Sequence, residues 1–341
     1  MTEARWWHPS RHADRRPFLL MRGQIRRALA DWFAAEGFVE VETAALQVSP
    51  GNETHLHAFA TEFRTDAGAV TPLYLHTSPE FACKKLLAAG ETKIVDFARV
   101  FRNREAGPLH APEFTMVEWY RTGASLDAVM QDAGNLCRTA LAATGRDALS
   151  WRGRTCDPGM TPEALTLTEA FYRYAKTDLD GLLDDRDGFL AAARAAGVGV
   201  PDDATWSDIF SAVLVARIEP HLGDGRLTVL HRYPVCEAAL ARACPDDPRF
   251  AERFELYACG VELANGFNEL TDPVEQRARF EADMDLKAAI YGERYPIDED
   301  FLDALARMPA ASGVALGFDR LAILASGARS IRDVQWTPVA P

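Results

Sequence analysis

Apolar residues recur at helical spacing near the start of the chain. Five of them fall on one helical face: Phe18, Met21, Ile25, Leu29 and Trp32. Gly37 follows at the position of a left-handed C-cap, so we predict an amphipathic helix over residues 18–36. Residues 38–43 then alternate between apolar and polar types, as a strand does, until Pro50 and Gly51 break the pattern. A helix followed directly by a strand is therefore expected here.

The remaining apolar segments predict a mixture of strands and helices. Further strands are expected at residues 73–76, 93–101, 114–120, 227–231, 253–261 and 314–318. Helices are expected at residues 126–144, 161–174, 187–196, 207–219, 273–291 and 298–307. Because the strands do not alternate regularly with the helices, we predict an α+β fold in which an antiparallel sheet is flanked by helices.

These elements predict one large domain. We expect residues 1–17 to form an N-terminal extension and residues 18–341 to form the folded domain. Within that domain, the segment from residue 150 to residue 225 is rich in Asp, Gly and Pro, which is typical of an insertion between strands. The length of 341 residues and the 48% share of hydrophobic residues are ample for a buried core.

Charge and cysteine content narrow the classes of function. The formal net charge of −13 argues against nonspecific binding of nucleic-acid backbones, which depends on Lys and Arg, and favours a cationic or small substrate. The six cysteines include no CxxC pair and no His at metal-ligand spacing, so neither a disulfide framework nor a zinc site is indicated. No segment approaches the roughly 18 uninterrupted apolar residues of a membrane span. We therefore expect a cytoplasmic protein with no membrane partner.

Residues 100–120 predict a strand, a charged loop and a second strand. In the second strand, alternation with a period of two places Phe114, Met116, Glu118 and Tyr120 on one face. A carboxylate and a phenol among aromatic residues are costly to bury unless they meet a polar partner. Either this face lines a polar site, or the strand lies at an edge of the sheet with its polar side in water.

Two glutamates flank a predicted hairpin later in the chain. If Ala258 and Cys259 form the loop of a tight hairpin that ends at Gly260, Glu255 and Glu262 oppose each other with their Cβ atoms roughly 5 Å apart. Like charges in this position need a cation, and Mg²⁺ is suited because it binds one or two carboxylates together with substrate phosphates. The alternative is a solvated pair of carboxylates on an exposed hairpin.

The same segment continues with three residues that share one face, namely Asn265, Phe267 and Glu269. Their parity differs from that of Glu262. For all four side chains to line one pocket the strand must contain a bulge, and we expect it near Gly266, where a glycine would ease the distortion.

A third informative stretch runs from Ser312 to Arg320. Small residues in its strand would permit the close approach of a ligand. Arg320, at the start of the helix that follows, could present its guanidinium fork to a phosphate. Taken alone, glycine in a strand more often reflects packing or a bulge.

Together these stretches resemble motifs of the class II aminoacyl-tRNA synthetases, specifically of the lysine subgroup. The chain is most similar to the elongation factor P lysine ligase family, a paralogue of lysyl-tRNA synthetase. The resemblance rests on residues 101–103, 110, 112–116, 118–120, 262–267, 269–272, 312–317 and 319–320, with residues 38–43, 50 and 78–80 nearer the N-terminus. It covers nearly all of residues 18–330.

The resemblance implies an ATP-dependent ligase that activates lysine or (R)-β-lysine as an aminoacyl adenylate and transfers it to a lysine side chain of elongation factor P. Arg102 and Arg320 would act in catalysis, and Glu255 and Glu262 would hold Mg²⁺. The amino acid would be bound by Ser78, Pro79, Glu80, Glu118, Tyr120, Glu262, Asn265, Phe267, Glu269 and Ala315. ATP would be contacted by Arg102, Asn103, Arg104, His110, Ala111, Phe114, Glu255, Leu256, Gly317 and Arg320.

Three positions refine this expectation. Arg104 and Ala111 stand where the family usually has Glu and Asn, so we expect the contacts to ATP to be rearranged, with Glu105 as a substitute. Ala315 stands where the tRNA synthetases usually have Gly. That replacement matches the ligase family and suggests a pocket shaped for a variant amino acid such as (R)-β-lysine.

The resemblance also predicts the partners. Only residues 1–17 precede the first predicted helix, which leaves no room for the OB-fold with which lysyl-tRNA synthetases bind the anticodon. We therefore expect elongation factor P, rather than tRNA, as the acceptor, and a homodimer formed through residues 18–50. Two other functions stay open: a freestanding ligase that acts on tRNA or another acceptor, and a noncatalytic sensor of lysine or nucleotide.

Overall fold

An eight-stranded sheet forms the centre of the protein. The computed structural model describes residues 5–339, and its sheet has the strand order β1-β5-β6-β14-β13-β12-β11-β9. In chain order the strands are β1 (Val39–Val41), β5 (Lys93–Phe101), β6 (Glu113–Thr122), β9 (Glu163–Thr166), β11 (Thr228–Pro234), β12 (Phe250–Ala258), β13 (Val261–Asn268) and β14 (Ala311–Gly317). All neighbours are antiparallel except the outermost pairs, β1 with β5 and β9 with β11. The predicted α+β fold is thus confirmed.

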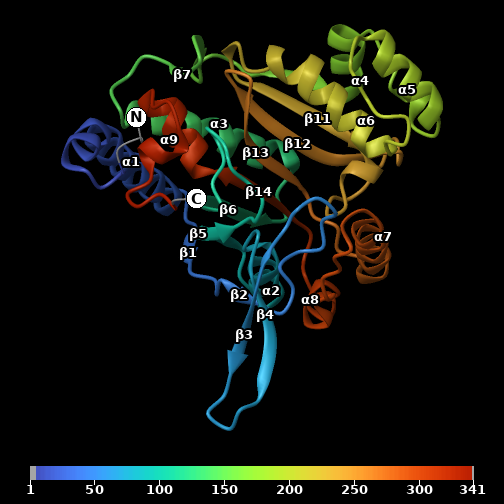
Figure 1. Cartoon of the computed structure of the whole chain (residues 1–341), viewed down its shortest axis with the longest axis horizontal. Coiled ribbons are helices and arrows are strands. Elements are labelled where there is room, and N and C mark those ends of the chain that lie inside the picture. The colour runs from blue at the N-terminus through green and yellow to red at the C-terminus, as the bar shows by residue number, and fades with distance from the viewer. Residues whose placement is uncertain (1–4, 340–341) are drawn as a thin grey trace.

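Three helices cover one face of this sheet: α1 (Pro9–Ala35), α3 (Leu126–Ala142) and α9 (Phe318–Ser326) (Figure 1). The side chains of Val117 and Trp119 are fully buried against them, as the alternation along β6 predicts. The short helix α10 (Ile331–Val334) extends the same layer. The main hydrophobic core therefore lies on the face of the sheet opposite to that of Glu118 and Tyr120.

Helix α1 begins earlier than the hydrophobic pattern indicates. We expected its start at Phe18, but the helix begins at Pro9, whose fixed φ suits a first helical position. Residues 9–17 thus continue the helix. Arg15 is buried there and its Nε donates to the carbonyl oxygen of Arg332 at 2.8 Å, so this turn is attached to the C-terminal layer.

The second face of the sheet is bordered by α2 (Glu80–Ala88), α7 (Pro273–Tyr291) and α8 (Glu299–Leu305). Phe81, Phe280 and Phe301 of these helices form a small core with Ile94 and Tyr120 of the sheet. Strands β3 (Phe59–Arg64) and β4 (Val70–Leu75) form a hairpin that projects from this side (Figure 1). The short strand β2 (Leu46–Gln47) pairs with the other edge of β4. Only part of this face is covered, which leaves room for a cleft.

Residues 149–226 form a layer of short elements with a core of their own. They comprise β7 (Leu149–Trp151), β8 (Arg154–Asp157), β10 (Gly225–Arg226), α4 (Leu167–Ala170), α5 (Arg186–Ala195), α6 (Trp206–Val213), π-helical turns at Phe171–Ala175 and Leu214–Ile218, and 3₁₀ turns at Asp180–Leu182 and Glu219–His221; a further 3₁₀ turn follows at Val235–Glu237. Their core contains Phe171, Phe189 and Phe210 and packs against β11 and β12. The helix expected at residues 161–174 was placed too early, because Thr166 caps the helix and β9 precedes it.

No helix within residues 5–339 is long and apolar enough to cross a membrane.

Candidate active site

The open face of the sheet carries a row of functional side chains in register. Glu118 of β6 opposes Ala315 of β14, Ala315 opposes Asn265 of β13, and Asn265 opposes Glu255 of β12. Residues directly opposed in a sheet point to the same face. Four residues that we selected from three separate stretches of sequence therefore lie side by side.

The next row on this face consists of Tyr120, Gly313, Phe267 and Arg253. A Cβ atom added to Gly313 would lie 2.4 Å from Glu269 Oε1 and 2.4 Å from Tyr120 Cε1. The expected need for small residues in β14 thus has a specific cause here: Gly313 leaves space for two side chains of the site.

The hairpin of β12 and β13 differs from our prediction. Its loop is Cys259 and Gly260, both with positive φ, one residue later than expected. As a result, Glu262 opposes Tyr257 rather than Glu255. The shift follows from the turn, because a two-residue loop with two positive φ values matches the twist of the strands.

The predicted bulge is present, but it lies at Leu263 and not near Gly266. The register jumps from Leu256–Ala264 to Tyr257–Glu262, which leaves Leu263 without an opposed residue. Gly266 has another function, since a Cβ atom there would lie 2.6 Å from the ring of Phe254. The bulge nevertheless has the predicted effect: it turns Glu262 to the same face of the strand as Asn265, and both residues line the same cavity.

A cleft with an empty volume of about 800 Å³, its open mouth included, lies over this face. Eight of the predicted site residues line it: Arg102, His110, Phe114, Glu262, Asn265, Ala315, Gly317 and Arg320. Glu53, Glu105 and Asp319 line it as well. The two arginines expected to act in catalysis therefore share one cavity.

Arg102 enters the cavity from the end of β5. Its Nε donates to the carbonyl oxygen of Thr77 at 3.2 Å, and its guanidinium carbon lies 5.4 Å from the ring centroid of Phe114. Glu105, the expected substitute contact, lies 3.8 Å from Arg102 Nη1. Because Nη2 has no protein acceptor among the described residues, the fork can receive an anion.

Arg320 lies across the cavity at the start of α9. Its Nη1 pairs with Glu262 Oε2 at 3.1 Å, and its Nη2 lies 2.8 Å from His110 Nε2. Burial, and next the charge of Arg320, lower the pKa of His110. His110 is therefore neutral at pH 7 and accepts from the guanidinium, which holds Arg320 in place.

A second, smaller cavity is lined by Ser78, Pro79 and Glu80, and it borders a group of buried acidic side chains that we call the acidic pocket. Glu118 is buried there, accepts from Ser78 Oγ at 2.7 Å, and also accepts from the hydroxyl of Tyr120. Glu53 lines both cavities and so marks their junction. The polar partners expected for Glu118 and Tyr120 are thus each other and Ser78.

Glu269 lies at the base of this pocket, directly after β13. Both of its carboxylate oxygens are buried, and Oε1 has no hydrogen-bond partner among the described residues. Its one ionic contact is with Lys84, whose Nζ lies 2.6 Å from Oε2. Sequence reasoning missed Lys84 because no helix was predicted at residues 80–88, so its spacing of four residues from Glu80 was not recognised as an ion pair on one helix face.

Burial governs the titration of this pocket. It raises the pKa of Glu118 and of Glu269 to about 8, with the neighbouring carboxylate of Glu80 adding to the effect, and the two groups titrate together. The folded, ligand-free protein thus holds protons that the unfolded chain releases near a pKa of about 4.3.

This proton retention predicts a pH dependence of stability. Because the folded pKa is raised, the stabilisation is complete below the unfolded pKa and is lost as the pH rises toward 8, by up to about 1.4 kcal/mol per pH unit for each retained proton. Glu118→Gln should flatten this decline in the free energy of urea-induced unfolding measured from pH 5 to pH 8. Parallel curves for the two proteins would contradict the assignment.

The two glutamates expected to hold Mg²⁺ lie at different depths. Glu262 lines the cavity with 36% of its side chain exposed, whereas Glu255 is buried and bound by Arg253 Nη2 and the hydroxyl of Tyr257, each at 2.6 Å. Burial, and the charge of Glu262 as a smaller contribution, raise the pKa of Glu255. The two carboxylates thus interact, but residues 5–339 contain no group of three or more His, Cys, Asp or Glu placed to hold a metal.

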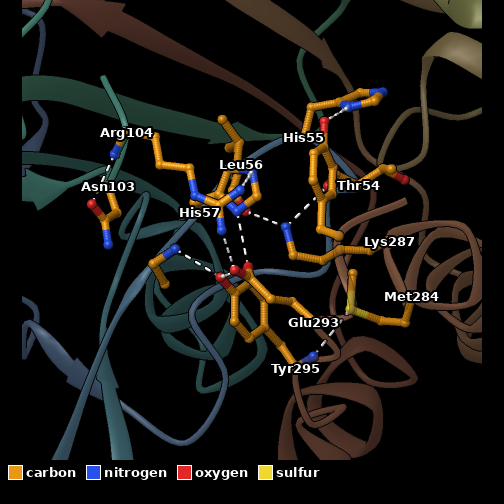
Figure 2. A network of polar contacts seen from close by, with 12 residues as sticks. Thr54, His55, Leu56, His57, Asn103, Arg104, Met284, Lys287, Glu293 and Tyr295 are labelled. Atoms are coloured by element: carbon orange, nitrogen blue, oxygen red, sulfur yellow. Dashed lines mark hydrogen bonds and ion pairs between the residues drawn. The ribbon is translucent and has the colours of Figure 1, made fainter. Parts of the chain in front are cut away.

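Arg104, expected at the ATP, points away from the cavity. It adopts a left-handed backbone conformation with φ of 65°. Figure 2 shows its guanidinium directed at Glu293, with which it forms an ion pair, and at His57, whose Nε2 lies 3.4 Å from Nη1. Lys287 in the same network donates to the carbonyl oxygens of Thr54 and Leu56 (Figure 2). Arg104 therefore fastens the segment that carries Glu53 to the residues following α7.

Four other predicted ATP contacts also lie outside the cavity lining, namely Glu255, described above, and Asn103, Ala111 and Leu256. Asn103 is exposed and its amide pairs with the carbonyl oxygen of His57. Ala111 and Leu256 are buried in the main hydrophobic core. Sequence reasoning did not distinguish these positions, because neighbours along a strand or loop share a motif while their side chains point to different sides.

The fold and the site together define the class of this protein. The family described as tRNA synthetases class II (D, K and N) matches residues 2–340, and the chain belongs to it. The elongation factor P–(R)-β-lysine ligase of Proteus mirabilis (strain HI4320) is 39% identical over 99% of this chain and 99% of its own length. The ligases of the same name from Salmonella dublin and Salmonella enteritidis PT4 are 39% identical over 98% of both chains. The resemblance seen in the motifs is confirmed.

Proposed function

We propose that this protein is an ATP-dependent ligase that activates lysine or (R)-β-lysine as an aminoacyl adenylate and transfers it to a lysine side chain of elongation factor P. One observation carries the proposal: Arg102 lines the cavity that also holds Arg320 and Glu262, and it donates to the carbonyl oxygen of Thr77, which lines the smaller cavity together with Ser78, the partner of Glu118. A site for a triphosphate thus adjoins a site for amino groups. The names of the relatives support this choice of amino acid and acceptor.

In the first step, a carboxylate oxygen of the amino acid attacks the α-phosphorus of ATP. The bond from that phosphorus to the bridging oxygen breaks, pyrophosphate leaves, and a mixed anhydride forms. Two anions must meet, and the guanidinium of Arg102 can bond to both. Positioning and charge neutralisation account for such a reaction, so no side-chain nucleophile is needed.

The remaining residues of the cavity would orient the two substrates. Phe114 offers an aromatic face to the adenine, and Arg320, held by His110, would bind the nucleotide from the opposite side. Glu118, Tyr120, Asn265 and Glu269 would surround the amino groups of the amino acid. Glu255 and Glu262 would hold Mg²⁺, which supplies positive charge to the phosphates.

In the second step, the ε-amine of the acceptor lysine attacks the carbonyl carbon of the anhydride. AMP leaves with the bonding electrons, the amine loses a proton, and an amide bond remains. The amine must be neutral when it attacks, which desolvation or a neighbouring carboxylate can favour. We expect this reaction to take place in the cytoplasm.

The proposal is tested by two measurements on the purified protein. Pyrophosphate exchange into ATP should depend on lysine or (R)-β-lysine, and incubation of the full mixture with elongation factor P should increase the mass of that protein by one amino acid residue. Total tRNA serves as the competing acceptor. Exchange without either isomer, or a charged tRNA with unmodified elongation factor P, would refute the proposed function.

We further propose that two copies of the chain associate through residues 18–50, which include most of α1 and all of β1. Apolar side chains are exposed along this region, including Leu20 at 45%, Val39 at 51% and Val48 at 52%. Exposed apolar residues are typical of an interface where they gather on one surface. Sedimentation of the protein at micromolar concentration distinguishes a dimer from a monomer.

A further inference from the structure

Lys84 is a buried cation at the base of the acidic pocket. It lies on α2 with 1% of its side chain exposed. Its Nζ lies 2.5 Å from Glu80 Oε1, one turn earlier on the helix, and 2.6 Å from Glu269 Oε2 at the end of β13. A lysine is seldom fully buried unless it is paired. Here a single ammonium joins two carboxylates that belong to different layers of the fold.

The charges around this ammonium do not balance. Three carboxyl groups, those of Glu80, Glu118 and Glu269, surround one cation, so two of them lack a cationic partner, and in the ligand-free protein Glu118 and Glu269 retain protons instead. Among the described residues, Glu269 has no donor other than the ammonium of Lys84. Buried carboxylates in this condition need further cationic donors. A diamino acid supplies two ammonium groups, which is the number that the pocket lacks.

We propose that Lys84 is a positioning residue that fixes Glu80 and Glu269 and sets the charge of the pocket to match an amino acid with two ammonium groups. This inference rests on the proposed function. It adds a determinant of the substrate class that lies one layer behind the groups expected to touch the substrate.

The direction of the effect follows from the titration of the pocket. Glu269 has a pKa of about 8 even though the charge of Lys84 lowers it, so without that cation the carboxyl group would hold its proton more tightly still. A neutral carboxyl no longer pairs with an ammonium, and binding would have to expel its proton. The titratable groups that face Glu269 are Glu80, Cys83 and Lys84 of α2 and Glu118 and Tyr120 of β6. None of them except Lys84 carries a positive charge.

The test uses Lys84→Met, with Lys85→Met as the matched control. Lys85 is the next residue of α2, but its Nζ pairs with Asp298 and Asp300, each at 2.8 Å, away from the pocket. In pyrophosphate exchange, Lys84→Met should raise the KM for the diamino acid about 10- to 100-fold, as expected for truncation of one partner of a buried charge pair. The KM for ATP should change little, and Lys85→Met should resemble the wild type.

A double-mutant cycle separates charge matching from packing. Glu80→Gln removes one carboxylate, so adding Lys84→Met to it restores the original charge of the pocket. The double variant should bind the amino acid better than the product of the two single effects predicts. If the single variant Lys84→Met does not fold, the double variant is compared with Glu80→Gln alone. Its KM for the amino acid should then differ little from that of Glu80→Gln.

Three results would overturn the inference: an unchanged KM for the amino acid in Lys84→Met, multiplicative effects in the cycle, or an equal rise in the KM for ATP. A wild-type protein without lysine-dependent exchange would overturn the proposed function and this inference together. Failure of the inference alone is recognised by normal exchange in the wild type.

Discussion

Arg102→Ala should lower the rate of lysine-dependent pyrophosphate exchange by roughly two to three orders of magnitude. Loss of one preorganised donor at a developing charge typically costs about 3 kcal/mol. Arg102 is half-buried, rests on Phe114 and is anchored to Thr77, so its guanidinium is already in place before substrates bind. The effect should lie mainly in kcat, because the bridging contact is strongest when carboxylate and phosphate meet.

Arg104→Ala is the matched control for that experiment. The two arginines are two residues apart, but Arg104 points to Glu293 and does not line the cavity. Its removal should leave the exchange rate within a few fold of the wild type, since an exposed ion pair contributes only about 0–1 kcal/mol. A loss of exchange rate in Arg104→Ala as large as that in Arg102→Ala would indicate that Arg104 contacts ATP, as the motif predicts.

Gly313→Ala should weaken binding of the amino acid while leaving ATP binding in place. The new methyl group would displace Glu269 and the ring of Tyr120, because a central strand paired on both sides cannot move away. Overpacking of this kind costs typically 1–3 kcal/mol, which corresponds to a rise in the KM for the amino acid of roughly 5- to 150-fold.

Gly23→Ala provides the control for this substitution. Gly23 lies in α1, and a Cβ atom there would meet nothing within 4 Å. It should stabilise the helix by about 0.5–1 kcal/mol and leave both KM values unchanged. An unchanged KM for the amino acid in Gly313→Ala would show that the two side chains need not occupy their present positions.

Patterns that repeat over many residues were read correctly. The long strands β5 and β6 and the helix α7 follow from periodicity, and the polar face of β6 was assigned from alternation alone. The start of α1 was missed because residues 9–17 are polar and charged, so no apolar stripe marks them. Short elements of the segment from 149 to 226 depend on caps and π-helical turns, which leave weak signals.

The composition of the site could be predicted better than its geometry. Motifs selected Asn265, Ala315 and Arg320, and the structure brings them to one cavity. The exact pairing of β12 with β13 could not be derived, because moving a two-residue loop by one position changes which residues oppose each other. Lys84 was missed because its burial is decided by α2 packing against the sheet, which no local pattern records.

The unpaired Leu263 shifts the alternation of side chains along β13 by one residue. On the side toward the loop, Glu262 faces the cleft, and beyond Leu263 the strand has resumed its ordinary alternation with Asn265 also facing the cleft. If the strand kept all its residues but lost the bulge, regular alternation would turn Glu262 into the hydrophobic layer while Asn265 kept its orientation. The presence of Glu262 in the cleft consequently depends on the bulge at Leu263, while the two loop residues of the hairpin line neither cavity.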